Sequence, residues 1–150
     1  MTKNLTIAEV CELSLKAWVK LMHELWPDHQ VTSLEIEAHK ILKSKKETAF
    51  LLSIDEKFVG FINVSIRTDY VPGATHSPVG YIEGIYIKPK LRHRGMAKKL
   101  VEHATQWFLT NGCKEIGSDS EIENVVSQGW HEAMGFAQSK QLVHYIKTLS

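Results

Sequence analysis

The spacing of apolar residues along the chain changes period several times, and each change marks a predicted element. Val10, Leu13, Ala17 and Leu21 follow helical spacing, whereas short runs rich in Val, Ile, Phe and Tyr are typical of strands. The predicted helices are 6–25, 32–45, 97–110 and 124–134. The predicted strands are 49–54, 58–67, 81–87, 115–118, 136–140 and 142–148, with a further short one at 3–5. This order predicts an α/β chain with a mixed sheet.

Two tetrapeptides have the form of a helix-capping box. Thr6 to Glu9 (TIAE) and Thr32 to Glu35 (TSLE) each place a hydroxyl three residues before a carboxylate. In such a box each side chain accepts a hydrogen bond from the other residue's backbone N–H. We therefore expect the first two helices to begin at these boxes, and Pro27 to end the first of them.

Polar residues, prolines and glycines mark the turns. The polar triplet 55–57 separates two strand-like runs, which predicts a β-hairpin. Segment 68–79 holds two prolines and a glycine, which predicts a loop. Asn111 and Gly112 end the predicted helix 97–110 in the manner of a C-cap.

Composition narrows the class of protein. The chain has 150 residues, of which 43% are hydrophobic and 23% charged, so we expect one globular domain over 1–150. Its net charge of +1 argues against a protein that binds nucleic acid through bulk positive charge. The low net charge and the many aromatic residues also argue against disorder.

Location and metal content are the next expectations. No apolar run approaches the ~20 residues of a membrane span, and the first nine residues lack a signal-peptide apolar region. Cys11 and Cys113 form no metal-ligand spacing, and the histidines form no ligand motif. We therefore expect a cytoplasmic protein that binds no membrane and no metal.

The segment from Tyr81 to Ala104 is the most informative for chemistry. A strand leads through a basic turn into Gly95, and a long amphipathic helix begins there. The first turn of a helix has unpaired N–H groups and a partial positive charge, and a glycine lets an anion approach the backbone closely. Positive charge is added by Arg92, Arg94, Lys98 and Lys99. The sequence predicts an anion-binding loop at this helix start, although such a basic turn can also simply cap its own helix.

The spacing within the loop distinguishes between kinds of anion. Neither GxxxxGK[ST] nor GxGxxG is present, which excludes a P-loop and a Rossmann fingerprint. Arg92, Gly95 and Ala97 instead form R-x-x-G-x-A. This motif resembles the Q/R-x-x-G-x-G/A signature of the GNAT superfamily of N-acetyltransferases, which implies that the loop holds the pyrophosphate of acetyl-coenzyme A.

Four separated blocks make the resemblance more specific, and it extends over nearly the whole chain. The blocks LWPDH (25–29), SPVGYIEGIY (77–86), SD (118–119) and WHEAMGF (130–136) look like those of the short aminoglycoside 6′-N-acetyltransferases. Gly117 and Trp130 depart from that pattern, where Ala and Phe or Met are usual. The resemblance implies the GNAT fold, with a splayed strand pair that holds acetyl-CoA, and transfer of its acetyl group to the 6′-amine of aminoglycosides.

Two carboxylates are the candidate catalytic residues. Glu83, in the strand before the loop, and Asp119, at the end of the next strand, resemble substrate-binding carboxylates of this family, and either is a candidate for the general base. The simpler alternatives are a solvent-facing strand glutamate and an aspartate that caps a turn. Because aminoglycosides are polycations, a carboxylate-rich acceptor site is expected.

The remaining site residues follow from the same resemblance. The acceptor is expected to contact Trp26, His29, Tyr70, Glu83 and Asp119, although Trp26 is equally suited to a core position. The expected coenzyme-binding residues are Ile85, Tyr86, Ile87, Arg92, His93, Arg94, Gly95, Met96, Ala97, Asn124, Ser127 and His131. The proton donor to the leaving thiolate stays open between His131, Tyr145 and no dedicated acid. Asn124 is equally suited to a helix N-cap.

Other functions stay open at this stage. The same fold and cofactor could serve another amine, such as a polyamine or a peptide or protein amine. A module that only binds coenzyme A is a further alternative, against which the two retained carboxylates argue. Family members commonly dimerise, so the resemblance also implies a homodimer.

Overall fold

The computed structural model describes residues 4–150 and contains five strands and four α-helices. In chain order the elements are β1 (Leu5–Glu9), α1 (Leu15–Leu25), α2 (Val31–Lys43), β2 (Glu47–Ile54), β3 (Lys57–Arg67), β4 (Val79–Ile87), α3 (Met96–Thr110), β5 (Ile116–Gly117) and α4 (Val125–Ala133). Single turns of 3-10 helix precede α1 (Glu12–Ser14) and α3 (Pro89–Leu91).

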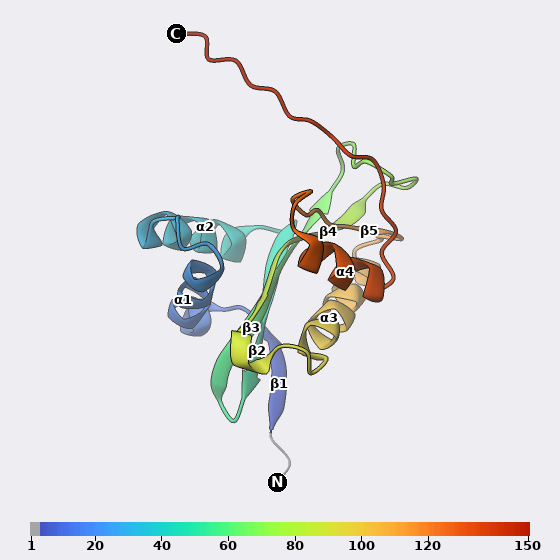
Figure 1. Ribbon diagram of the computed structural model, residues 1–150. Coiled ribbons are helices and arrows are strands. Elements are labelled where there is room, and N and C mark those ends of the chain that lie inside the picture. Colours follow the sequence, from blue (N-terminus) through green and yellow to red (C-terminus); the bar gives the residue numbers. More distant parts are fainter. Residues whose placement is uncertain (1–3) are drawn as a thin grey trace.

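The strands form one mixed sheet in the order β1-β2-β3-β4-β5. The first four strands are antiparallel to their neighbours, and β5 lies parallel to β4. Helices α1 and α2 cover one face of the sheet, and α3 and α4 lie on the other (Figure 1). The predicted α/β class with a mixed sheet is confirmed.

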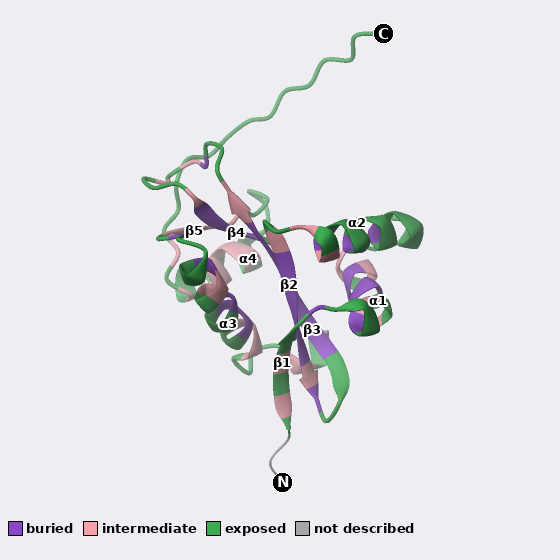
Figure 2. Cartoon of the chain, turned by 180° about the vertical axis from the view of Figure 1, so that it is seen from behind, coloured by how far each residue is buried: buried purple, intermediate pink, exposed green. Residues whose placement is uncertain are grey.

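Each face of the sheet has its own core, because the strands between the helix layers are apolar on both sides. On one face Trp18 and Met22 of α1 pack against Phe61 of β3. On the other, Leu100 and Phe108 of α3 belong to the second core. Figure 2 shows the buried residues along the central strands and the inner sides of the helices.

The hairpin and the loops agree with the prediction. Ile54 pairs with Lys57, so Asp55 and Glu56 form a two-residue turn, and both have positive φ angles of 50° and 69°. Two consecutive positive φ angles characterise the turn that matches the twist of a hairpin. Segment 68–78, between β3 and β4, contains no helix or strand.

The predicted start of the first helix is wrong. Residues 5–9 form the edge strand β1, in which Leu5 pairs with Ile54 and Glu9 with Phe50. The TIAE segment therefore caps no helix, because its strand-like alternation and the free edge of β2 outweigh the local capping pattern. Helix α1 begins only at Leu15. The expected strand at 3–5 overlaps β1 at Leu5 alone, and Lys3 lies outside the described residues.

The second capping box is also wrong. Helix α2 begins at Val31, with Gln30 as its N-cap and no side-chain hydrogen bond at that cap. Thr32 therefore lies within the first turn of the helix. The Gln30 side chain accepts no hydrogen bond from the first turn, so the helix start rests on the packing of Leu34 and Ala38 against α1 and the sheet.

The predicted final strand pair, 136–140 and 142–148, is absent from the described chain. Residues 137–150 contain no helix or strand and leave the body in an extended path (Figure 1). Their five large apolar side chains are between 58% and 100% exposed, and these are Leu142, Val143, Tyr145, Ile146 and Leu149. Strand-like composition produces a strand only where the segment pairs with a neighbouring edge, and among residues 4–150 this tail pairs with no strand.

Within residues 4–150, no helix is long and apolar enough to cross a membrane.

Candidate active site

The sheet opens between β4 and β5. These parallel strands pair only through Gly80 with Ile116 and Tyr81 with Gly117. Beyond Tyr81, β4 continues for six residues to Ile87 while β5 has ended. This is the splayed strand pair that the resemblance implied.

Two backbone N–H groups of β4 point into this opening. The N–H of Lys88 donates to the Val59 carbonyl at 2.9 Å, toward β3. Hydrogen-bonded positions alternate along an antiparallel ladder, so the N–H groups of Ile85 and Ile87 face away from β3. Fixed backbone donors of this kind stabilise an oxyanion that develops during acyl transfer.

The side chain of Tyr86 lies on the face of the sheet that α1 and α2 cover. It belongs to the core under α1, and its hydroxyl donates to Glu24 at 2.9 Å. Lys88 also pairs with Glu24, at 3.3 Å. Of the predicted coenzyme-binding residues, Tyr86 can therefore take part only through its backbone.

The loop before α3 has the geometry of an anion site. Gly95 is the N-cap of α3 with a φ angle of +79°, and no side chain caps the helix. A Cβ atom at Gly95 would meet nothing within 4 Å beyond its chain neighbours, so the space beside Gly95 itself is open. His93 also has a positive φ angle, of 64°. The backbone N–H groups of this loop therefore fit a pyrophosphate.

The basic side chains of the loop differ in their contacts. Arg92 donates from Nε to the Ile87 carbonyl at 2.7 Å and thereby ties the loop to the end of β4. His93 and Arg94 are exposed, whereas Met96 and Ala97 are partly buried against the core of α3. His93 and Arg94 are thus free to contact an anion, while Met96 and Ala97 contribute backbone.

Helix α4 brings three of the predicted residues together. Asn124 accepts a hydrogen bond from the Ser127 N–H at 3.0 Å, which confirms its N-cap alternative. Nδ1 of His131 lies 2.7 Å from the Ser127 carbonyl, which can only accept, so Nδ1 carries the hydrogen. Nε2 of His131 then accepts from the Ser118 hydroxyl at 2.8 Å. In this arrangement both hydrogens are engaged within the chain, so neither His131 nor Ser118 has one left for a thiolate.

Glu83 lies at a β-bulge in β4. Asn63 of β3 pairs with Gly84, and the next residue, Val64, pairs with Ile82, so Glu83 is an extra residue between them. Its carboxylate accepts hydrogen bonds from Arg67, at 2.8 Å from Nη2 to Oε1. The bulge thus turns Glu83 toward the face of the sheet that carries Arg67.

Further contacts fix the Glu83 carboxylate. Nε of Arg67 donates to Oε2 at 3.1 Å, and the Ser65 hydroxyl donates to the same oxygen. The Glu83 side chain is 34% exposed and that of Arg67 is 40% exposed. Glu83 is therefore a held carboxylate with both oxygens engaged.

Asp119 joins the same network through Tyr81. The Tyr81 hydroxyl donates to Oδ2 of Asp119 at 2.6 Å, and the Arg67 guanidinium stacks 3.4 Å from the centroid of the Tyr81 ring. Burial, followed by the hydrogen bond to Asp119 and its charge, raises the pKa of the Tyr81 phenol well above its ordinary value. Tyr81 therefore stays a donor, and the structure brings Glu83 and Asp119 to the two ends of one network.

Trp26 lies directly over the bulge. A Cβ atom at Gly84 would come within 2.6 Å of the Trp26 ring, so the glycine is needed for this contact. Trp26 packs 6.0 Å from Phe61 between ring centroids and 6.1 Å from His29, which is exposed. Trp26 is partly buried, so it serves the core and also borders the region beside Glu83.

The structure does not bring all predicted residues to the opening. Tyr70, in the loop between β3 and β4, is 76% exposed and makes no side-chain hydrogen bond with residues 4–150. Tyr145 is 91% exposed in the tail, which extends away from the sheet (Figure 1). Within one chain, Tyr145 is therefore not a donor at this site.

Sequence reasoning did not identify Ser65, Arg67 and Tyr81. Alternation along β3 places Asn63, Ser65 and Arg67 on one face, and this period-two spacing of polar residues was the available signal. Their link to Glu83 depends on strand pairing, which a single strand does not reveal.

Glu47, at the start of β2, adds negative charge to this face of the sheet. Burial, followed by the charges of Glu37 and Glu83, raises the pKa of the Glu47 carboxyl, and Lys40 opposes this in part. Glu47 pairs in register with Ser65, which contacts Glu83. A further carboxylate therefore lies within electrostatic reach of Glu83.

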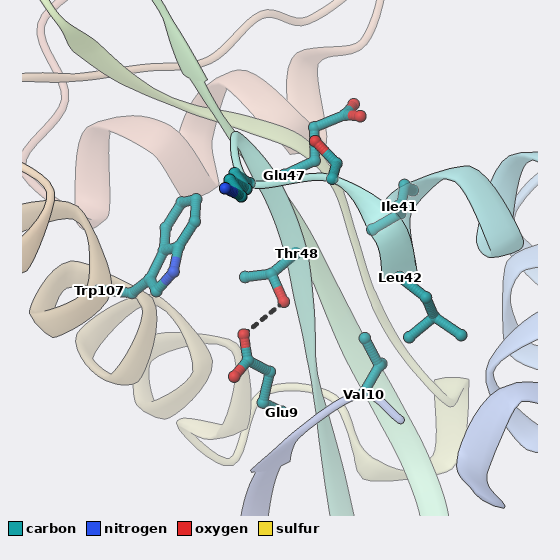
Figure 3. Close-up of a pocket in the computed structure, with 9 residues that line it drawn as sticks. Glu9, Val10, Ile41, Leu42, Glu47, Thr48 and Trp107 are labelled. Carbon is teal, nitrogen blue, oxygen red and sulfur yellow. Dashed lines mark hydrogen bonds between the residues drawn. The ribbon is translucent and has the colours of Figure 1, made fainter. Parts of the chain in front are cut away.

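A cavity of about 240 Å³ lies at the far edge of the sheet, where β1 ends (Figure 3). Thr48 donates to Glu9 there at 2.6 Å, and Trp107 of α3 faces them across the cavity. The Glu47 side chain points away from this pair (Figure 3). None of the predicted site residues lines the cavity, so it is separate from the opening.

Among residues 4–150, no three His, Cys, Asp or Glu side chains come together in a group that could hold a metal ion.

Comparisons with known proteins agree with this geometry. A model of the acetyltransferase (GNAT) family matches residues 15–136. An aminoglycoside N(6′)-acetyltransferase type 1 of Serratia marcescens is 40% identical over 137 residues, which make up 91% of this chain and 94% of that relative.

Solved structures of aminoglycoside N-acetyltransferases are also similar to this chain. The aminoglycoside N-acetyltransferase AAC(6′)-Iy in complex with CoA matches with a TM-score of 0.95 at 34% identity, over 98% of this chain and 97% of that one. The same protein in complex with the bisubstrate analogue CoA-S-monomethyl-acetylneamine gives a TM-score of 0.93 at 34% identity, over 97% and 99% of the two chains.

Proposed function

Because the chain belongs to the acetyltransferase (GNAT) family, we propose that it transfers the acetyl group of acetyl-coenzyme A to the 6′-amino group of aminoglycoside antibiotics and so confers resistance. One observation carries the choice of acceptor: Glu83 and Asp119 lie in a single network beside the opening of the sheet. Two carboxylates at this place suit a polycationic acceptor. The curated relatives carry the same activity in their names.

Acetyl-coenzyme A supplies the acetyl group as a thioester, and the chain supplies its binding site. The backbone from Arg92 to Ala97 would hold the pyrophosphate at the N-terminus of α3. The N–H groups of Ile85 and Ile87 would hold the thioester carbonyl oxygen. Asn124, Ser127 and His131 of α4 would border the pantetheine arm.

The acceptor would approach from the face that carries Trp26 and Glu83, with His29 at the rim, and attack directly in a ternary complex. Glu83, already held by Arg67, orients an ammonium group, and Asp119 takes the proton of the attacking amine. Only Oδ2 of Asp119 accepts a hydrogen bond from the described residues, so Oδ1 is available. The thiolate would leave without a dedicated acid and take its proton from solvent, because the hydrogens of Ser118 and His131 are already donated to His131 and to the Ser127 carbonyl.

We expect acetyl-CoA turnover with kanamycin, measured as released thiol, and little with paromomycin, whose 6′ position carries a hydroxyl. A hydroxyl is a much weaker nucleophile than a neutral amine, so the difference assigns the reacting position. Spermidine is the third acceptor. Spermidine turnover without kanamycin turnover would contradict the proposal and favour a polyamine acetyltransferase.

The chain is further proposed to act as a homodimer in the cytoplasm, with residues 1–150 as one acetyltransferase domain. Five apolar side chains of the tail 137–150 are exposed in the single chain. Burial of such side chains is favourable, and a second copy would offer a surface on which the tail could pack. The cytoplasm supplies acetyl-CoA.

Ile146→Asp is expected to convert the dimer into a monomer, because it places a charge at a side chain that is 100% exposed in the single chain and would be buried in the dimer. Light scattering after size-exclusion chromatography measures the mass. Leu13→Asp is the matched control, because Leu13 is 97% exposed and lies outside the tail. A wild-type protein that stays monomeric at high concentration would contradict the dimer.

A further inference from the structure

We propose that Arg67 is a specificity-determining residue: its guanidinium occupies the acceptor site beside Glu83 and favours acceptors with several ammonium groups over acceptors with one. The inference rests on the proposed function and adds to it that the site distinguishes acceptors by the number of their positive charges. It concerns a residue that the reaction itself does not require.

The contacts of Arg67 are those of a bound cation. Nη2 lies 2.8 Å from Oε1 of Glu83, and Nε lies 3.1 Å from Oε2. This two-point contact matches the planar guanidinium to the carboxylate. The same guanidinium stacks 3.4 Å from the Tyr81 ring centroid, in cation–π geometry. Arg67 thus already fills the position beside Glu83 that suits an ammonium group.

The charge of Arg67 is permanent. Burial alone would lower the pKa of Arg67, but the hydrogen bond and charge of Glu83, with smaller contributions from Tyr81 and Asp119, raise it above its ordinary value. In the free protein, the positive charge of Arg67 therefore stays beside Glu83 at every working pH. An acceptor ammonium that binds Glu83 must compete with this internal partner.

The competition depends on the number of charges that the acceptor carries. Arg67 is tethered to the sheet, so its effective concentration at Glu83 is high. A single partly exposed ion pair contributes little to binding, so one acceptor ammonium does not replace the two-point contact of Arg67. A polycation has further partners in Asp119 and in Glu47, whose pKa responds to Glu83. Several contacts together can displace Arg67 where one cannot.

A purely positioning role for Arg67 makes a different prediction. If Arg67 only oriented Glu83 for catalysis, its removal would lower turnover of every acceptor by the same factor. If Arg67 competes with the acceptor, its removal favours the acceptor with one charge. The ratio of two specificity constants separates these roles.

The test uses Arg67→Met, which keeps an apolar stem on Tyr81 without the charge, and Arg67→Lys, which keeps the charge. The acceptors are kanamycin and 6-amino-6-deoxyglucose, which has one amine at the corresponding position. We expect the kanamycin to aminoglucose ratio of kcat/KM to fall about tenfold or more in Arg67→Met and to change less than about threefold in Arg67→Lys. Lys57→Met, in the hairpin, is the control for loss of a cation elsewhere.

Calorimetric titration with both acceptors gives the ratio of Kd values without turnover, and thermal unfolding checks that each variant folds. An unchanged ratio, or equal losses for both acceptors, would overturn the proposal for Arg67. Failure of the wild-type protein to acetylate kanamycin would instead overturn the proposed function, and the selection with it. Acetylation of kanamycin by the wild type with an unchanged ratio in Arg67→Met would overturn the selection alone.

Discussion

Replacing Asp119 with Asn is expected to lower kcat with kanamycin by about 10²- to 10⁴-fold, the range of a positioned general base. Asn keeps the size of the side chain and can still accept the Tyr81 hydrogen bond of 2.6 Å, but its amide cannot take a proton from the amine. Steady-state thiol release gives kcat and KM for both substrates, and the KM for acetyl-CoA should not change.

Glu83→Gln is the informative comparison for Asp119→Asn. Both oxygens of Glu83 already accept hydrogen bonds from Arg67, so we expect this variant to raise the KM for kanamycin more than it lowers kcat. Asp55→Asn, in the hairpin turn, is the matched control and should behave as wild type. A loss of kcat confined to Glu83→Gln would identify Glu83, and not Asp119, as the general base.

Trp18→Ala is expected to destabilise the protein by about 3–5 kcal/mol, the typical cost of truncating a buried Trp. Trp18 is fully buried, and its indole N–H donates to Oδ1 of Asn63 at 3.0 Å. Its removal leaves a cavity under the sheet and a buried amide oxygen without its donor. Guanidinium denaturation followed by circular dichroism measures the free energy of unfolding.

The consequences of Trp18→Ala should extend to the bulge, because Asn63 pairs with Gly84 there. Leu13→Ala is the control, since Leu13 is 97% exposed and its truncation should change stability by about 0.5 kcal/mol or less. A loss below about 1 kcal/mol for Trp18→Ala would contradict the assigned role of Trp18 in the core.

Local signals predicted much of the fold. The hairpin at 55–57, the loop before β4 and the glycine at the start of α3 each depend on neighbouring residues, and the structure contains all three. The TIAE segment shows the limit of such signals. The same four residues suit a helix cap and an edge strand, and the free edge of β2 decides between them.

The network that joins Glu83 to Asp119 could be predicted from the sequence only in part. Glu83 and Asp119 were recognisable in separate motifs, but their connection through Arg67 and Tyr81 requires the register of β3 with β4. The bulge that turns Glu83 toward Arg67 has no signature in the sequence, because it arises from a mismatch between two strands. The tail 137–150 has strand-like composition but forms no strand, because periodicity does not show whether a segment will find a strand to pair with.

The bulge at Glu83 has a consequence for how this protein can evolve. Asn63 and Val64 pair with Gly84 and Ile82 as if Glu83 were absent, so the regular ladder does not depend on that residue. Most catalytic positions inside a sheet are constrained by the core, and changes there trade activity against stability. Here the proposed acceptor-binding side chain of Glu83 is supplied by a residue on which the strand pairing does not depend. Selection can therefore replace it to suit a new acceptor while the core on both faces stays intact.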